Sequence, residues 1–253
     1  MNRSVCCYPQ PRKQKSREIL EAFTQGCEGI VADHAASIDD TRGAAFFGVV
    51  GIERLFQEAR ARARFWCYGD NSFLNVTRGT HFRFARDAFQ ISTSQPPDWA
   101  KWRALALEVA PWRRGDHVVV VEQSAHFLSL SGAGADWLFR VLAELGQHTD
   151  RPVVVRRWDR DKGGAAATLR RDMNGAHALV THMSAAANEA LLYGVPVFCT
   201  GPCAATPMAS GGLENIESPR YPEGREEWAA GLAGRQWTLE ELRGGAAWRA
   251  FDG

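Results

Sequence analysis

The chain has 253 residues, of which 45% are apolar and 23% charged, and its formal net charge is +1. This composition is that of an ordinary globular protein and excludes a disordered or fibrous chain. The balanced charge removes the general electrostatic argument for a protein that binds nucleic acid or a membrane surface, although local basic patches remain.

Cysteine usage and the lack of long apolar runs suggest a compartment. No stretch approaches the ~20 apolar residues of a membrane span, and the first residues lack the apolar core of a signal peptide. The six cysteines show neither a secreted disulfide pattern nor a CxxC pair. We therefore expect a protein of a reducing cytoplasm, with no membrane partner. The one cluster to consider for a metal is Cys199, Cys203 and His182, and its spacing does not favour zinc, so no metal site is expected.

The first part of the chain predicts an irregular alternation of helices and strands. Residues 81–90 resist assignment. The expected helices are 16–26 and 52–63, and the expected strands are 29–33, 44–50 and 64–70.

The second part alternates strand and helix with short links, a pattern that predicts a parallel sheet with helices on its faces. Residues 115–124 are almost entirely apolar, which is typical of a strand buried on both faces. The other expected strands are 151–158, 177–182 and 196–200, and the expected helices are 129–148, 165–176 and 184–193. The fold class is therefore α/β with a Rossmann-like, doubly wound second half.

Linker-like stretches define the expected domain organisation. Pro, Gly and polar residues gather in 92–99 and 111–116, which places a boundary between them. We predict a first domain over 1–105 and a second over 106–220. A tail over 221–253 is expected to contain two short helices that carry tryptophans.

The turn 181–184 (THMS) lies where an expected strand ends and an expected helix begins. Ligands bind beyond the carboxyl ends of strands in open parallel sheets. The first amides of a helix have no partner within it, and the helix dipole adds positive charge there. With Ser184 as an N-cap, this turn can hold a phosphate without a glycine-rich loop. Ser184 as a cap alone is the plainer reading, and the dinucleotide and P-loop motifs are missing.

Glu189 lies one helical turn beyond Ala185. Helical side chains lean toward the N-terminus, so this carboxylate can reach the same end of the helix and accept the two hydroxyl hydrogens of a ribose. The alternative is that an acid in an early helix turn simply complements the dipole.

The basic run that follows the strand 151–158 offers a second feature for an anionic ligand. Arg157 and Lys162 can neutralise the charge that develops on a diphosphate leaving group. The same run also fits an exposed, solvated loop.

Several stretches resemble glycosyltransferases of the two-Rossmann GT-B type. The strongest is SAAANEALLYGVPVF (184–198), which is similar to their donor-binding element. The closer resemblance is to the capsular-polysaccharide-synthesis-like branch, which includes bacteriophage proteins. Similar stretches there are VVVRRWDRDKG (153–163), FWCYGDNSF (65–73), HFRFARDAFQ (81–90) and the tail 216–242.

The resemblance implies two Rossmann-like domains facing a cleft, with the C-terminal helices packing back on the first domain. A nucleotide-sugar donor would bind the second domain as substrate, with no other cofactor and no metal required. Ser184 and Ala185 would then contact phosphate, Glu189 the ribose and Lys162 the diphosphate. Thr181, near the end of the expected strand 177–182, is also a candidate donor-binding residue.

A glycosyl transfer that inverts configuration needs a group that accepts the proton of the acceptor hydroxyl. Asp33 and Asp70 each follow an expected strand of the first domain and are the candidate catalytic residues. His34 and Arg83 are candidate acceptor-binding residues. Their alternatives are Asx turns for the two aspartates, a packed histidine, and an exposed strand face for Arg83 and Arg86.

The acceptor is less defined. The phage resemblance suggests a hydroxymethylated pyrimidine in DNA, and basic segments at 12–15, 60–64 and 113–114 are compatible with it. A base-level acceptor would have to be flipped from the duplex. The alternatives are a polysaccharide-directed glycosyltransferase, a nucleotide-binding module without catalysis, and a structural protein of assembly.

Overall fold

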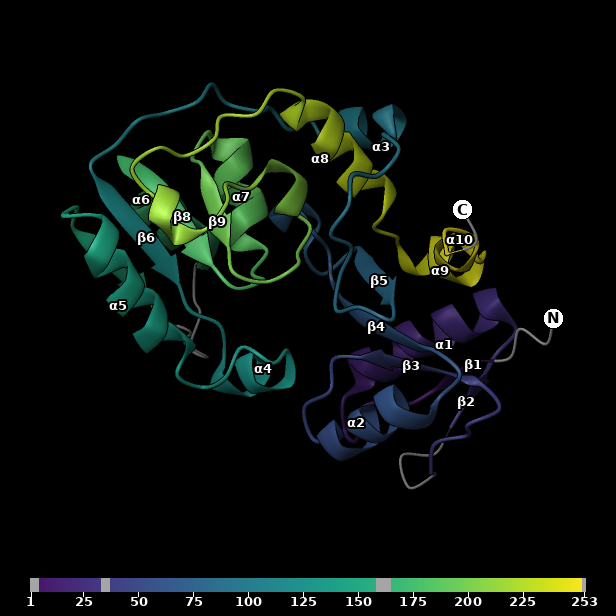
Figure 1. The fold of residues 1–253 in the computed structure, drawn as a ribbon. Helices are drawn as coiled ribbons and strands as arrows, with labels where there is room; N and C mark the ends of the chain where they lie inside the picture. The colour runs from purple at the N-terminus through teal and green to yellow at the C-terminus, as the bar shows by residue number, and fades with distance from the viewer. Residues whose placement is uncertain (1–4, 33–36, 158–164, 252–253) are drawn as a thin grey trace. The chain divides into compact units, whose positions relative to one another are not determined.

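The computed structural model describes residues 5–32, 37–157 and 165–251, with side chains of the last segment described from Leu169 onward. The chain divides into two compact units (Figure 1). The first unit comprises Met1–Ile91 and Gly234–Gly253, and the second comprises Ser92–Ala233. In the described residues, none of the helices is long and apolar enough to cross a membrane.

The first unit contains a five-stranded sheet in the order β2-β1-β3-β4-β5. The first four strands run parallel, and β5 is antiparallel to β4. The strands are β1 (Val5–Cys7), β2 (Ile30–Val31), β3 (Gly43–Phe47), β4 (Trp66–Asn71) and β5 (Phe82–Arg86). The helices are α1 (Gln14–Cys27), α2 (Glu53–Arg62), the short 3-10 helix η1 (Asn75–Thr77), α9 (Leu239–Arg243) and α10 (Ala246–Arg249).

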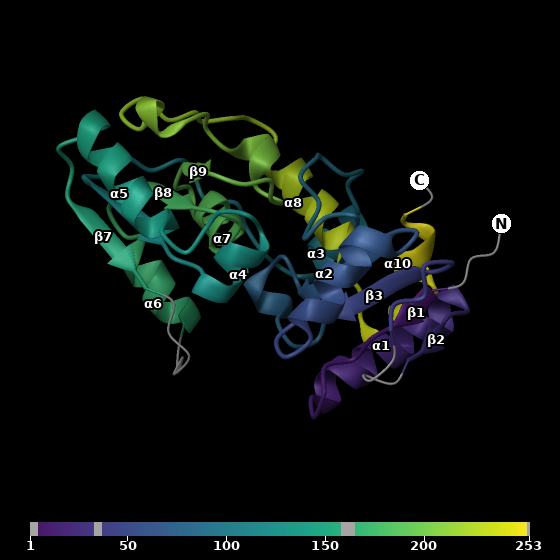
Figure 2. The same cartoon turned by 60° about the horizontal axis from the view of Figure 1, so that its bottom comes forward.

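Helices α1 and α2 cover opposite faces of this sheet (Figure 2). On the α1 face, Phe23 stacks on Phe84 with ring centroids 4.3 Å apart. On the α2 face, the ring of Phe56 meets Phe46 and Tyr68 edge-on. Successive strand residues point to opposite faces, and all five residues of the central strand β3 are buried, so the sheet is covered on both faces there.

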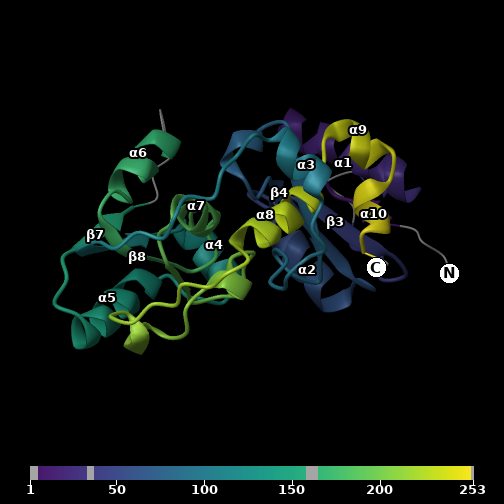
Figure 3. The same ribbon diagram turned by 90° about the horizontal axis from the view of Figure 1, so that it is seen from above.

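The C-terminal segment completes the first unit. Helices α9 and α10 pack against α1 (Figure 3). Thr238 caps α9 by accepting the N–H of Glu241, whose carboxylate in turn accepts the N–H of Thr238. The backbones of Trp237 and Phe82 exchange a pair of hydrogen bonds, each 2.8 Å long, beside β5.

The second unit contains a four-stranded parallel sheet in the order β7-β6-β8-β9. The strands are β6 (His117–Val121), β7 (Val153–Arg156), β8 (Ala176–Thr181) and β9 (Val197–Cys199). The helices are α3 (Trp99–Ala104), α4 (Ala125–Leu130), α5 (Trp137–His148), α6 (Ala165–Asp172), α7 (Ala186–Tyr193), the 3-10 helices η2 (Thr206–Met208) and η3 (Leu213–Asn215), and α8 (Arg225–Gly234).

Helix α5 covers one face of this sheet, and α6 and α7 cover the other (Figure 3). Val118 and Val120 of β6 pack with Trp137 and Val141 on the α5 side. Gly194 ends α7 with φ of 84°, and a Cβ at this position would lie 2.1 Å from the carbonyl oxygen of Pro111. Only glycine satisfies both conditions, so α7 stops here and the chain returns to the sheet as β9.

Both sheets share a topological feature. In each sheet, the strand that comes first in the chain lies between the second and the third. Thus β1 lies between β2 and β3, and β6 lies between β7 and β8. The point where the connections diverge, between β1 and β3 or between β6 and β8, is where α/β proteins bind ligands, beyond the carboxyl ends of the strands.

The observed elements correct several expectations. The helix expected over 129–148 is two helices, α4 and α5, because Gly132 and Gly134 between them adopt positive φ. Residues 82–86, which the sequence left unassigned, form β5, and the short strand β1 was not expected. The tail 221–253 holds three helices instead of two, since α9 and α10 are separated at the glycine pair 244–245.

Candidate functional site

The turn between β8 and α7 lies at the divergence point of the second sheet and is tied to the end of β6. Thr181 is fully buried, and its Oγ1 donates a 2.8 Å hydrogen bond to the carbonyl of Val121. Two residues later, the N–H of Met183 donates to Oε1 of Gln123 at 2.7 Å. The hydroxyl of Thr181 is thus already used within the fold, and its role is to fix this turn.

The start of α7 presents backbone donors. Ser184 Oγ accepts the N–H of Ala186 at 3.2 Å, while the cap position itself is Ala185, one residue later than the sequence suggested. Within the described residues, the N–H groups of Ser184 and Ala185 have no hydrogen-bond acceptor. Unpaired amides at a positive helix end form an anion-binding arrangement.

Glu189 is the acid of this helix. Its side chain is half-buried, between the fully buried Asn188 and Ala190. Small residues at 185–187 allow α7 to lie close to the sheet, so a carboxylate one turn along remains near the same edge. Glu189 as a residue is neither fully exposed nor buried, which is compatible with contact to a ligand.

A buried polar chain lies beside the turn. Trp137 Nε1 donates to Thr200 Oγ1 at 2.7 Å, and this hydroxyl lies 3.0 Å from Nδ1 of His182. Because the indole can only donate, Thr200 Oγ1 is the acceptor for Trp137, and the direction of the hydrogen bond between Thr200 and Nδ1 depends on the tautomer of His182. Nε2 is buried and has no partner in the described part of the chain.

Burial is the main cause that lowers the pKa of His182, and the positive charge of Arg140 adds to it. A Cβ at Gly201 would lie 2.4 Å from the imidazole, so this glycine permits the close approach of the backbone to the ring. The histidine is held neutral and in place at the carboxyl end of β8.

The end of β7 carries the predicted basic residues. Arg157 is exposed, whereas its neighbour Arg156 forms a 2.7 Å ion pair with Asp172 at the end of α6. Lys162 lies outside the described residues. The structure therefore leaves Arg157 available to an anion at the sheet edge and ties Arg156 to the fold.

In the first unit, Asp70 and Arg83 form an ion pair at the carboxyl end of β4. Their N···O distance is 3.2 Å, and the side chain of Arg83 is 10% exposed against 38% for Asp70. Arg83 Nε also donates to the carbonyl of Asn71 at 2.8 Å, and its guanidinium lies over the ring of Phe73. The exposed-strand alternative is therefore wrong for Arg83, whose Nη1 is buried without a partner in the described residues. Asp33 and His34 lie outside those residues.

In the basic segment 60–64, two of the arginines have structural contacts. Arg60 lies over the rings of Phe56, Trp66 and Phe89, and Arg62 pairs with Glu58. Arg60 therefore packs against aromatic rings beside helix α2, and Arg62 forms an ion pair along the helix.

No group of three metal-ligating side chains occurs in the described ranges of the chain. Cys199 and Cys203 interact with one another, which raises the pKa of the Cys199 thiol and lowers that of Cys203 to about 7. His182, the third member of the cluster that the sequence suggested, instead contacts Thr200.

The sequence did not predict three residues that hold the site in place: Gln123, Trp137 and Thr200. Gln123 is a polar residue two positions after the buried strand β6, which is the one local signal that pointed to it. The Trp137–Thr200 contact joins residues 63 positions apart and has no such signal.

Two α/β units with largely parallel sheets, each diverging beside its central strand, define a Rossmann-like fold. Two solved structures share it along almost the whole chain. The β-Kdo 2,4 transferase of KpsC from Thermosulfurimonas dismutans superposes with a TM-score of 0.53 at 15% identity, covering 91% of each chain. The β-Kdo 2,7 transferase of the same protein gives a TM-score of 0.55 at 13% identity, covering 98% of this chain and 99% of that one. Neither a protein-family model nor a curated protein matches the sequence. The chain thus has the fold of these transferases.

Proposed function

We propose that this protein is a glycosyltransferase that moves a sugar from a nucleotide-sugar donor, bound by the second unit, to a hydroxyl acceptor. The observation that carries the proposal is the start of α7. There, the unpaired N–H groups of Ser184 and Ala185 lie at the divergence point of the sheet, one turn before the half-buried Glu189. The fold shared with two Kdo transferases supports the same reaction class.

Each donor-side residue has a distinct task in this proposal. The backbone N–H groups of Ser184 and Ala185 donate hydrogen bonds to the phosphate oxygens, and the helix dipole stabilises the negative charge of the phosphate. Glu189 accepts the hydroxyl hydrogens of the ribose. Arg157, with Lys162, neutralises the departing phosphate as the glycosidic bond breaks. Thr181 and Gln123 hold the turn in position.

On the acceptor side, we propose that Asp70 or Asp33 takes the proton of the attacking hydroxyl and that His34 and Arg83 position the acceptor. Asp70 is partly open to solvent, so an acceptor can reach it. Arg83 holds the carboxylate of Asp70 through the ion pair, and its own guanidinium is fixed by the carbonyl of Asn71. The acceptor that we propose is a hydroxymethylated pyrimidine in DNA.

Nucleotide-induced stabilisation tests the donor site. Melting temperatures would be measured with UDP-, GDP- and CMP-linked sugars, including a Kdo-linked nucleotide because of the structural likeness. At least one should stabilise the protein. Glu189→Gln should weaken that donor by about 10- to 100-fold, which is the range for one hydrogen bond to a charged group. Glu144→Gln, an exposed acid on α5, is the matched control and should change nothing.

Turnover separates the enzyme from a non-catalytic nucleotide-binding module. Hydrolysis or transfer of the bound donor by the intact protein supports the enzyme. Binding without any turnover supports the module. If no sugar nucleotide stabilises the protein, or if Glu189→Gln binds the donor as tightly as the unmodified protein does, the proposed donor site is wrong.

A further inference from the structure

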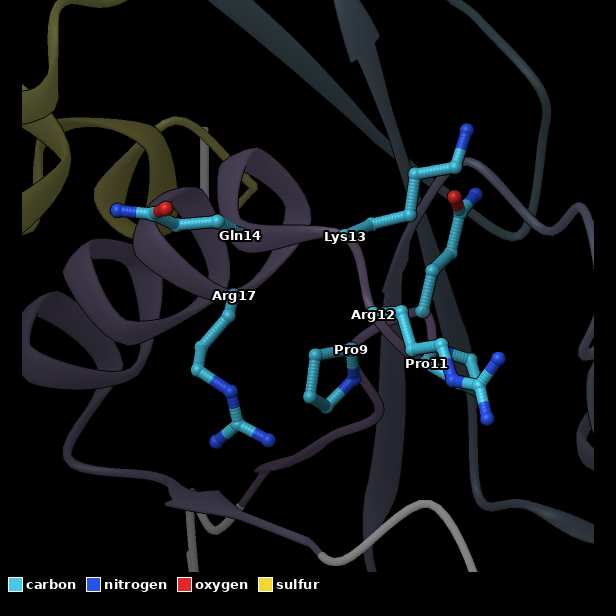
Figure 4. A pocket seen from close by; sticks show the side chains of 7 residues that line it. Pro9, Pro11, Arg12, Lys13, Gln14 and Arg17 are labelled. Atoms are coloured by element: carbon cyan, nitrogen blue, oxygen red, sulfur yellow. The ribbon is translucent and has the colours of Figure 1, made fainter.

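A cavity in the first unit lies at that unit's own divergence point. Its volume is about 340 Å³, and residues of the loop after β1 and the first turns of α1 line it, among them Pro9, Gln10, Arg12, Lys13 and Arg17 (Figure 4). Gln10 reaches toward the neighbouring strand, since a Cβ at Gly48, directly after β3, would lie 2.5 Å from its Nε2. The cavity thus stands where an α/β sheet of this order binds its ligand.

The lining of the cavity is basic, and its charges have few partners. Arg12 and Lys13 are exposed and pair with no carboxylate in the described residues. Arg17 is 3.9 Å from Glu21, and both side chains are about half exposed, so this pair is weak. Figure 4 shows the side chains of Arg12 and Arg17 on either side of the Pro9 ring.

The start of α1 lacks the residues that usually stabilise the N-terminus of a helix. Its cap residue, Lys13, makes no side-chain cap, and its first turn contains no acid. The N–H groups of Gln14, Lys15 and Ser16 have no acceptor in the described residues. Cations at a positive helix end are unfavourable, and acids are what stabilise it. A 14-residue helix that gathers cations at this end therefore has an arrangement that a bound anion would stabilise.

Gln10 is an independent sign of a ligand. It is 8% exposed, and its side-chain amide makes no hydrogen bond within the described residues, although its backbone N–H bonds to Ser16 Oγ at 3.1 Å. A side chain that is largely buried and makes no hydrogen bond keeps its donors available for a bound group. Its NH₂ donor can bind the same oxyanion as the helix amides.

We propose that this cavity is an anion-binding site for a phosphate group, formed by the amides of Gln14–Ser16, the side chains of Arg12 and Lys13, and the amide of Gln10. That the phosphate belongs to the acceptor rests on the proposed function, because the second unit holds the donor. The site itself does not depend on catalysis.

Titration of the full chain with inorganic phosphate tests the site by ¹⁵N-resolved NMR and by thermal shift. Sodium chloride at matched ionic strength controls for screening, and acetate tests a carboxylate. Phosphate should shift the amide signals of Gln14, Lys15 and Ser16 and raise the melting temperature. The double variant Arg12→Asn with Lys13→Gln should weaken phosphate by at least about tenfold. Asn suits position 12 because Arg12 has φ of 57°, a conformation that Asn tolerates.

The control variant is Arg78→Gln with Arg243→Gln, which removes the same charge from exposed positions of the first unit. It should bind phosphate as the unmodified protein does. Without phosphate, the Arg12/Lys13 variant should be at least as stable as the unmodified protein, because like charges have left the helix end. A variant that merely misfolds would be less stable instead.

Three results would overturn the proposal: phosphate binding that survives in the Arg12/Lys13 variant, amide shifts confined to Ser184 and Ala185, or a response to acetate that equals the response to phosphate. Failure of the proposed donor site gives a different result from failure of the phosphate site. In that case no sugar nucleotide stabilises the protein, while the signals of Gln14–Ser16 still respond to phosphate.

Discussion

The backbone N–H of Met183 donates a 2.7 Å hydrogen bond to the side-chain Oε1 of Gln123, and this bond joins the turns that follow β8 and β6. Together with the Thr181–Val121 bond, it determines where the start of α7 lies relative to the sheet. The geometry of the candidate donor site therefore depends on residues that do not contact the donor.

Gln123→Ala should both destabilise the protein and weaken donor binding. The N–H of Met183 would lose its acceptor, at a cost of about 1–3 kcal/mol in unfolding free energy. Urea denaturation measures the stability, and nucleotide thermal shifts measure the donor. Gln123→Glu separates the two effects, because it keeps an acceptor oxygen but adds a negative charge near the phosphate. It should restore stability and still bind the donor weakly. Equal donor affinity in all three proteins would contradict this role.

His182 should make the protein less stable at acidic pH. Burial holds its pKa in the folded protein below that of the unfolded chain, which is about 6.5. Between these two values the unfolded chain binds more protons, so the free energy of unfolding falls as pH drops below about 6.5. The slope from this residue is at most about 1.4 kcal/mol per pH unit. Below the folded-state pKa, the loss ends.

The pH effect is measured as the difference between two proteins in urea denaturation from pH 7.5 to 5. His182→Gln should show a shallower decline than the unmodified protein. His148→Gln, which removes an exposed histidine from the end of α5, should decline as the unmodified protein does. If the curves of His182→Gln and the unmodified protein run parallel, His182 does not titrate as the structure indicates.

Removal of the Asp70 side chain should destabilise the protein more than removal of the Arg83 guanidinium. Asp70→Ala leaves a guanidinium that is 10% exposed without its ion pair, whereas Arg83→Met leaves a carboxylate that water can reach. The first change should therefore reduce the free energy of unfolding more, by about 1–3 kcal/mol. A double-mutant cycle by urea denaturation checks this order. If Asp70 is also the proton acceptor, Asp70→Asn should reduce transfer by about 10²- to 10⁴-fold. Retained transfer would leave Asp70 with the structural role alone.

Two Gly→Ala substitutions in the second unit should change the stability of the protein in opposite directions. Gly194→Ala forces a side chain into positive φ and against the carbonyl of Pro111, so it should destabilise the protein by more than about 1 kcal/mol. At Gly146 in α5, a Cβ meets nothing within 4 Å. Gly146→Ala should stabilise by about 0.5–1 kcal/mol, because alanine restricts the unfolded chain. Thermal denaturation of both variants checks the signs, and a tolerated Gly194→Ala would contradict the close approach.

The sequence by itself predicted the four strands of the second sheet, β6 to β9, and the helix α7 that joins the last two. The apolar runs that became β6 and β8 are long and uninterrupted, and Gly194 marks the end of α7. These are local signals, because side-chain periodicity and glycine conformation depend on neighbouring residues. For the same reason, Ser184, Ala185 and Glu189 could be placed together on one turn of helix before any contact was known.

Only the tertiary structure decided the contacts that hold the sites in place. Gln123 meets Met183 across 60 residues of chain, and Trp137 meets Thr200 across 63. The alternation in residues 82–86 gave no sign that Arg83 is buried, because its cover comes from residues brought there by folding. β1 is three residues long and gains its stability from β2 and β3 on either side. Pairings between distant residues follow from the packing of whole elements, and no short stretch of sequence encodes them.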